Sequence, residues 1–223
     1  MDWTAIALSV KLATVVCAIL LAIGIPIAYW LTFSRWRWKF LVESVVALPL
    51  VLPPTVLGFY VLVAIGSRSP IGRAWVSWTG GSLAFTFEAL VLASVLYSLP
   101  FVVQPIAAAF SLIDRTLLEA SATLGAARFK TFARIILPLS RNGLITGAVL
   151  GFAHTIGEFG VVLMVGGNLP GETRTISIAL YDSVQAFDLA AAHRTSLALL
   201  LFSFASLMVV YGLIRKPWSV PHE

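Results

Sequence analysis

Five long apolar runs constrain the fold of this chain more than any other feature of its sequence. A helix needs about 20 predominantly apolar residues to cross the hydrocarbon core of a bilayer, and each run is close to that length or longer. The runs cover residues 5–33, 40–66, 83–113, 144–165 and 196–214. This pattern predicts an all-α membrane protein, a polytopic bundle of about five transmembrane helices that forms a single domain over residues 1–223.

The composition supports a membrane protein. Hydrophobic residues make up 59% of the chain and charged residues 11%, whereas soluble domains contain roughly 45–50% apolar and about 25% charged residues. The net charge of +5 does not indicate a nucleic-acid partner, because the basic residues lie in short clusters between the apolar runs, as topology-setting charges do. The single cysteine, Cys17, excludes a disulfide within the chain.

The number of crossings and their direction follow from the segments between the runs. A sixth span would have to lie within residues 71–87, which Arg73, Gly80 and Gly81 interrupt, so five is the expected number and six the alternative. One set of connecting segments holds ten Lys and Arg residues: Arg35, Arg37, Lys39, Arg115, Arg128, Lys130, Arg134, Arg141, Arg215 and Lys216. The other set holds five: Lys11, Arg68, Arg73, Arg174 and Arg194. The richer side is expected to be cytoplasmic, with the N-terminus outside and the C-terminus inside.

Two of the runs contain residues that bend helices or let them pack closely. Pro49, Pro53 and Pro54 interrupt the second run, and proline kinks a helix and frees backbone carbonyls. Such helices either line a cavity or only shape the packing of the bundle. The fourth run has four small residues at intervals of four: Gly143, Gly147, Gly151 and Thr155. This ridge predicts a close helix contact, within one subunit or between two copies.

The fourth run also carries ionisable residues at membrane depth, where charge is costly and usually functional. His154 and Glu158 lie four residues apart, so a continuous helix would place them on one face. Two ligands are weak evidence for a metal site, and we predict instead a mutual hydrogen bond or a Glu near the outer interface. The candidates for the pathway or its gate are Pro49, Pro53, Pro54, His154, Gly157, Glu158 and Phe159.

The segment between the third and fourth runs, residues 112–141, is too polar to span and too periodic to be irregular. Its first part predicts a short helix with one face made of Leu117, Ala120, Ser121 and Leu124. Gly125 suits the end of that helix, because left-handed torsions cost glycine little. A second amphipathic helix has an apolar face of Phe129, Phe132, Ala133 and Ile136. Pro138 marks a bend into the fourth span. Such a hairpin can lie on the membrane or dock in a groove of another protein.

The same loop resembles the EAA loop of ABC importer permeases, whose pattern is Glu-Ala-Ala, three residues, Gly, nine residues and Ile-x-Leu-Pro. The spacing matches throughout, and Ser121 replaces the third residue of the triplet. The resemblance implies that the first helix is a coupling helix, which inserts into a cleft of a separate nucleotide-binding subunit. The residues we assign to ATPase coupling are Glu119, Ala120, Ser121, Gly125, Arg128, Ile135, Leu137 and Pro138.

Further segments resemble the molybdate subfamily of these permeases. They are LPLVLPPTVLG at residues 48–58, GEFGVVLM at 157–164, GNLPGETRT at 167–175 and SIALY at 177–181. Sulfate permeases share parts of these motifs. The resemblance implies a type I importer permease in the bacterial inner membrane that moves molybdate or tungstate. Arg174 and Arg194 either steer such an anion on the outer side or are ordinary solvated charges.

The resemblance also implies the partners. A second copy of the chain completes the pathway, two ATP-binding subunits lie below it, and a periplasmic binding protein delivers the substrate. The chain has no G-x-x-x-x-G-K-[ST] phosphate loop, so we expect no enzyme activity and no bound cofactor, with ATP and Mg on the partner. The alternatives are a permease for sulfate or another solute, and an ATPase-independent secondary transporter, for which the EAA spacing would have no purpose.

Overall fold

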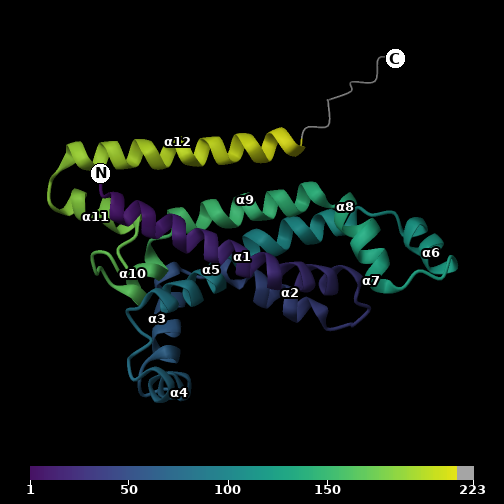
Figure 1. Ribbon diagram of the computed structural model, residues 1–223, viewed down its shortest axis with the longest axis horizontal. Helices are drawn as coiled ribbons and strands as arrows, with labels where there is room; N and C mark the ends of the chain where they lie inside the picture. The colour runs from purple at the N-terminus through teal and green to yellow at the C-terminus, as the bar shows by residue number, and fades with distance from the viewer. Residues whose placement is uncertain (215–223) are drawn as a thin grey trace.

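The computed structural model describes residues 1–214, and all regular elements in that part of the chain are helices (Figure 1). In chain order they are α1 (Trp3–Phe33), α2 (Lys39–Ala47), η1 (Leu48–Leu50), α3 (Pro54–Ile65), α4 (Pro70–Thr79), α5 (Phe87–Ser111), α6 (Arg115–Thr123), α7 (Arg128–Thr131), η2 (Phe132–Ile136), α8 (Leu137–Leu139), α9 (Arg141–Gly157), α10 (Gly160–Gly166), α11 (Ile176–Gln185) and α12 (Leu189–Ile214). The predicted all-α bundle is confirmed. Arg215 and Lys216, counted above on the basic side, lie outside the described residues.

The predicted spans appear as three long helices and two bent pairs. Helices α1, α5 and α12 are each long and apolar enough to cross a membrane. The second span is α2 with η1, followed after a bend of 109° by α3. The fourth begins with α9, which follows the α7–α8 segment of the loop after a bend of 71°. Residues 71–87 do not supply a sixth span, because α4 has ten residues and is about 15 Å long, half the thickness of the hydrocarbon core.

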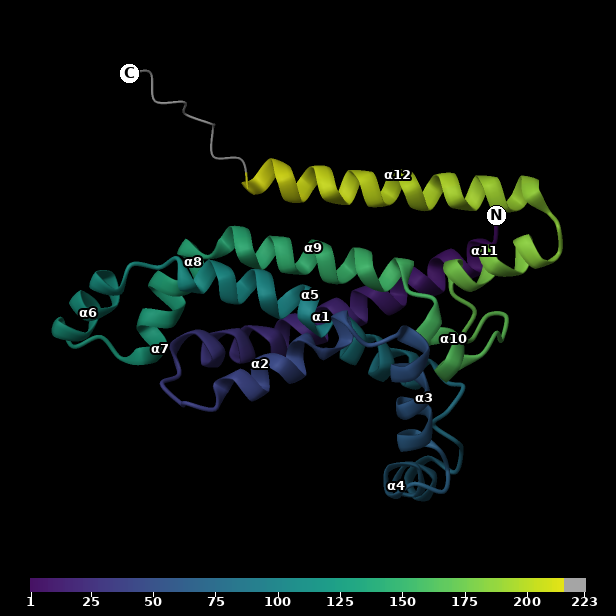
Figure 2. The ribbon, with the colours of Figure 1, turned by 180° about the vertical axis from the view of Figure 1, so that it is seen from behind.

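Helices α1, α5 and α9 form the centre of the bundle, and they lie side by side in both ribbon views (Figures 1 and 2). Their contact is made by fully buried aliphatic side chains, among them Leu12, Leu20, Val102 and Ile106. Helix α12 packs on the outer side of α9 and on α11. Most of its large side chains are exposed, which is what a lipid-facing helix requires, since lipid solvates apolar surface.

The glycine ridge of α9 packs against α5 of the same chain. A Cβ built on Gly143 would lie 2.8 Å from the carbonyl oxygen of Pro105, and one on Gly147 would lie 3.0 Å from that of Val102. Neither contact leaves room for a side chain, because the opposing atoms belong to the backbone. The ridge therefore serves packing within one subunit, the first of the two alternatives that the sequence left open.

The variant Gly143→Val should destabilise the bundle. Its side chain would push α9 away from α5, and overpacking of this kind costs about 1–3 kcal/mol. We expect a lower thermal unfolding midpoint in detergent and less protein in the membrane fraction. The control is Gly212→Val on α12, where a Cβ meets no atom within 4 Å; equal losses in the two variants would contradict the packing assignment.

The two ends of the bundle differ in charge. The segment after α1 and the region from α6 to the start of α9 gather at one end, opposite the end that holds the N-terminus, α10 and α11 (Figure 2). All the described basic residues of the richer set belong to the first end, and those of the poorer set belong to the N-terminal part of α1, to α4 with the segment before it, and to the region around α11 and the start of α12. The fold thus keeps the separation of charge on which the predicted orientation rests.

Candidate functional site

Helix α6 has a well-defined start and end. The Asp114 carboxylate accepts a hydrogen bond of 2.9 Å from the backbone N–H of Thr116, and this bond holds the pKa of Asp114 below its ordinary value because it favours the charged form. At the other end Gly125 has φ +74°. The Ala126 N–H donates to the Ser121 carbonyl at 3.1 Å, which closes the last turn. The predicted helix and its glycine terminus are confirmed.

The faces of α6 differ from the prediction at one residue. Leu117 and Leu124 are 46% and 87% exposed and share an outer face with Ala120. Ser121 instead faces inward, is 6% exposed, and shares a hydrogen bond of 2.6 Å with the Thr131 hydroxyl of α7. This bond exists only because serine occupies the third position of the triplet, since alanine has no hydroxyl. Ser121 therefore ties α6 to α7 and does not belong to the exposed face.

The rest of the loop is less regular than the single helix that the periodicity predicts. It divides into α7, a wider π turn in η2 and then α8. Pro138 contributes to this because it has no N–H to donate to the carbonyl four residues earlier. The bend into α9 falls at Ser140, two residues later than predicted.

The assigned coupling residues are therefore placed in three different ways. Glu119, Ala120, Gly125, Arg128 and Pro138 are exposed. Ile135 and Leu137 are half-buried and flank Ile136, which is fully buried in the main core, so these residues hold the loop on the bundle. Ser121 joins the two parts of the loop. Helix α6 is thus exposed on its outer face and is attached to the bundle through buried residues of the loop.

A second region is formed by two interrupted helices. The chain bends between η1 and α3, where Pro49 is buried while Pro53 and Pro54 are exposed. The fourth span does not continue to residue 165 as predicted. Helix α9 ends at Gly157, Glu158 is extended with φ −65° and ψ 135°, and α10 begins at Gly160.

The two interruptions face each other across the contact between α3 and α10. A Cβ on Gly160 would lie 2.8 Å from the Cβ of Pro54, and one on Gly58 would lie 2.8 Å from the Cβ of Met164. Two of the four segments that resemble the molybdate subfamily, residues 48–58 and 157–164, are thus interlocked in space although they lie about 100 residues apart in sequence. Their glycines are required because the two helices leave no room for side chains.

The predicted hydrogen bond between His154 and Glu158 is wrong. The helix ends between them, so they do not share a face. The His154 Nδ1 is hydrogen-bonded to the Ser98 hydroxyl at 2.9 Å, and its ring stacks on Phe101 with centroids 3.9 Å apart. Glu158 is 4% exposed and is thus buried inside the protein. Both of its carboxylate oxygens lack a hydrogen-bond partner among the described residues.

The polar partners on α5 were missed from the sequence. Ser98 also contacts the Thr155 hydroxyl at 3.1 Å, and Tyr97 lies 5.0 Å from His154, ring to ring. Ser94 is fully buried on the same helix, and its hydroxyl has no hydrogen-bond partner among the described residues. A signal was present, since Ser94 and Ser98 are four residues apart in an otherwise apolar run and share one helix face.

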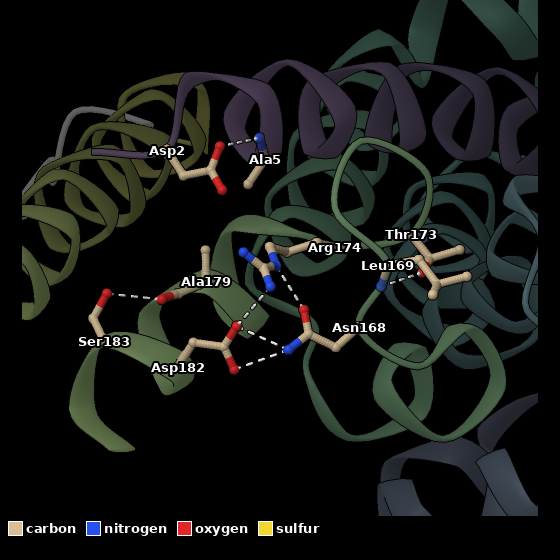
Figure 3. A network of polar contacts seen from close by, with 9 residues as sticks. All are labelled: Asp2, Ala5, Asn168, Leu169, Thr173, Arg174, Ala179, Asp182 and Ser183. Carbon is tan, nitrogen blue, oxygen red and sulfur yellow. Dashed lines mark hydrogen bonds and ion pairs between the residues drawn. The ribbon is translucent and has the colours of Figure 1, made fainter. Parts of the chain in front are cut away.

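The loop before α11 holds Arg174 in a polar network (Figure 3). Its Nε donates to the Asn168 side-chain oxygen at 2.6 Å, and its guanidinium forms an ion pair of 3.3 Å with Asp182. The Asn168 amide in turn donates to the Asp182 carboxylate at 2.9 and 2.8 Å. Arg174 therefore fixes the loop to α11 with its charge neutralised, while Arg194 is exposed and donates only to the Ala190 carbonyl.

The arrangement of spans, the exposed helix α6 with the EAA-like spacing and the interrupted helices are those of a membrane permease of the ABC importer class. Over residues 15–216 the chain matches the family model described as "Binding-protein-dependent transport system inner membrane component", and it belongs to that family. A similar fold occurs in a bacterial ABC transporter for the import of alginate (TM-score 0.70, 16% identity, 94% of this chain and 76% of that chain). It also occurs in the inward-facing MetNI methionine ABC transporter (TM-score 0.69, 16% identity, 95% of each chain).

Among curated proteins the chain is similar to molybdenum transport system permeases over nearly its whole length. It is 51% identical to "Molybdenum transport system permease protein ModB" of Azotobacter vinelandii over 211 residues, which cover 95% of this chain and 93% of the relative. It is 41% identical to the protein of the same name from Escherichia coli K12 over 184 residues, which cover 82% and 80%. These relatives are transport permeases.

Proposed function

We propose that this chain is the transmembrane permease subunit of an ATP-driven importer of molybdate, or of the chemically similar tungstate. The assignment of the substrate rests on the 51% identity to a molybdenum permease over 95% of the chain. The interlocked segments at residues 48–58 and 157–164 support it, because they resemble that subfamily and form the contact between α3 and α10. Tungstate and molybdate have the same charge and shape, so both fit the proposal.

The proposed importer contains two copies of this chain, two ATP-binding subunits and a periplasmic binding protein. The outer face of α6, with Leu117, Ala120 and Leu124 exposed, supports docking to an ATP-binding subunit, since an apolar helix face requires a groove in a partner. The alginate transporter has been solved in complex with a periplasmic protein. The end of the bundle that bears α6 to α8 faces the cytoplasm in this proposal, and the N-terminus lies outside.

The pathway runs beside the two interruptions. Interrupted helices line substrate sites in transporters because their free backbone groups can contact the cargo. Val51, Pro53 and Gly157 are exposed at the breaks and are available to a second copy or to the pathway. Glu158 is buried, so its carboxylate does not present a negative charge to an anion in transit. Movement of α6 with the ATP-binding subunits shifts the population between inward- and outward-open arrangements.

Transport by the reconstituted importer tests this proposal. The complete complex in proteoliposomes should take up radiolabelled molybdate when ATP is inside the vesicles and molybdate-loaded binding protein is outside them. Tungstate should compete strongly and sulfate weakly. If sulfate-loaded binding protein stimulates uptake and molybdate-loaded binding protein does not, the chain belongs to the sulfate alternative. Uptake without any ATP-binding subunit would contradict the importer class. Reporter fusions at the two termini check the orientation.

A further inference from the structure

A groove separates the α6–α8 region from the end of α1. Its outer part has a volume of about 610 Å³ and is lined from the α1 side by Tyr29, Phe33 and Arg35. From the loop side it is lined by Leu118, Ala122, Ala126, Arg128, Thr131 and Ile136. A second hollow of about 400 Å³ adjoins it and is lined by Pro26, Tyr29, Arg128, Phe129 and Phe132. Tyr29 and Arg128 line both hollows, so the two form one continuous groove.

The groove carries two positive charges that the described chain does not neutralise. The ion pairs within residues 1–214 are Lys39 with Glu43 and Arg174 with Asp182. Arg35 and Arg128, both exposed, therefore have no carboxylate partner there, although they line the same hollow from opposite sides. Two unpaired guanidinium groups that share one hollow favour an anion, and a phosphate group matches their geometry well.

The end of α1 that borders the groove carries the aromatic residues typical of the headgroup region of a membrane. Trp and Tyr concentrate at membrane interfaces, and the end of α1 is rich in them: the Trp30 and Trp36 rings are 5.8 Å apart, and Tyr29 lies against Phe132 at 5.3 Å. Pro26 is seven residues before the end of α1, so the inner hollow extends roughly 10 Å back along the span from that end of the helix. Apart from Tyr29 and Arg128, that hollow is lined by apolar side chains.

Helix α6 is attached to the bundle by few side chains. Ser121 bonds to Thr131, and Leu118 packs at the edge of the main core. The groove lies directly behind this attachment, between the helix and α1. A molecule that fills it would link the proposed coupling helix to the spans.

We propose that the groove binds one anionic phospholipid, with its phosphate between Arg35 and Arg128 and an acyl chain along Pro26, Tyr29, Phe129 and Phe132. The lipid fastens the α6–α8 loop to α1. A free phosphate would leave the apolar hollow unfilled, and an acidic protein segment has no reason to reach into the bilayer. The combination of two cations and an apolar extension fits a lipid.

The test uses the complete importer in detergent with added phosphatidylglycerol or phosphatidylcholine, and native mass spectrometry measures the lipid retained. Arg35→Gln should lower phosphatidylglycerol retention about fivefold, since one basic residue near a membrane surface contributes about 1 kcal/mol to binding of an anionic lipid. Arg37→Gln is the matched control, because it removes the same charge from the same segment but Arg37 lies over the Trp38 ring at 5.8 Å. Arg35→Lys should restore most of the retention.

A second arm tests the apolar part of the groove. Phe129→Ser should lower retention without changing charge, whereas Phe40→Ser, an exposed residue on α2, should not. Equal retention by Arg35→Gln and Arg37→Gln would overturn the proposal. A further measurement is the thermal unfolding midpoint of the complex with each ligand. Equal stabilisation by inorganic phosphate and by phosphatidylglycerol would also overturn the proposal, because it would indicate a phosphate site without lipid. Lipid retention is measured without transport, so failure of this proposal is distinguishable from failure of the proposed function.

Discussion

The variant Gly125→Val is expected to insert into the membrane but to lose transport. Gly125 ends α6 with φ +74°, a torsion that costs an L-residue roughly 1–2 kcal/mol and a β-branched residue more. A Cβ there meets no atom within 4 Å, so the damage arises from the backbone alone. The turn at the end of α6 would adopt a different backbone conformation, and the helix would no longer present its outer face to the ATP-binding subunit.

The measurements are molybdate uptake and co-purification of the ATP-binding subunit, each normalised to the amount of inserted permease. Gly80→Val is a matched control, because Gly80 ends α4 with φ +77° and also has no atom within 4 Å of a Cβ. Both variants carry the same local strain, but only Gly125 lies in the coupling loop. Gly125→Asn should be milder, since asparagine tolerates left-handed torsions. Normal uptake by Gly125→Val would contradict the proposed coupling role.

The variant Gly160→Val is expected to impair transport by separating the two interrupted helices. Its Cβ would lie 2.8 Å from the Cβ of Pro54, a ring that cannot rotate away. Overpacking costs about 1–3 kcal/mol, which corresponds to a shift of roughly 5- to 150-fold in the population of the packed arrangement. Uptake should fall accordingly, while binding of the ATP-binding subunit at the far end of the bundle should persist.

This second prediction separates a pathway effect from a coupling effect. Substrate-stimulated ATP hydrolysis and uptake should both change in Gly160→Val, whereas Gly125→Val should lose the ATP-binding subunit itself. Gly212→Val serves again as the control, because it places the same side chain on a helix with open space around it. Wild-type uptake by Gly160→Val would show that the contact between α3 and α10 is not required for transport.

The spans and the helix that ends at Gly125 were predictable because both depend on local patterns. Twenty apolar residues indicate a membrane helix whatever its neighbours are. Gly125 after an amphipathic run indicates a helix end because left-handed torsions favour glycine in any context. The fourth span was less predictable, since its apolar run continues to residue 165 although the helix ends at Gly157.

The partners of individual side chains were not predictable, because they come from distant parts of the chain. His154 was expected to pair with Glu158 on its own helix, but its partner is Ser98 on α5. Ser121 was expected to share one face of α6 with Leu117, Ala120 and Leu124, but it is buried against Thr131 while those residues are exposed. In each case a contact with another helix decided the outcome: with α5 across the bundle for His154, and with the neighbouring helix α7 for Ser121.

Hydrophobicity, charge placement and glycine torsions act locally, so the sequence was enough to predict a membrane bundle with a polar loop whose first helix ends at Gly125. Three further facts required the three-dimensional arrangement: the α9 glycines pack on α5, the breaks at Pro53 and Gly157 interlock through Pro54 and Gly160, and Arg35 and Arg128 share one groove. Those facts depend on which helix surfaces meet, and close packing across the bundle selects that arrangement.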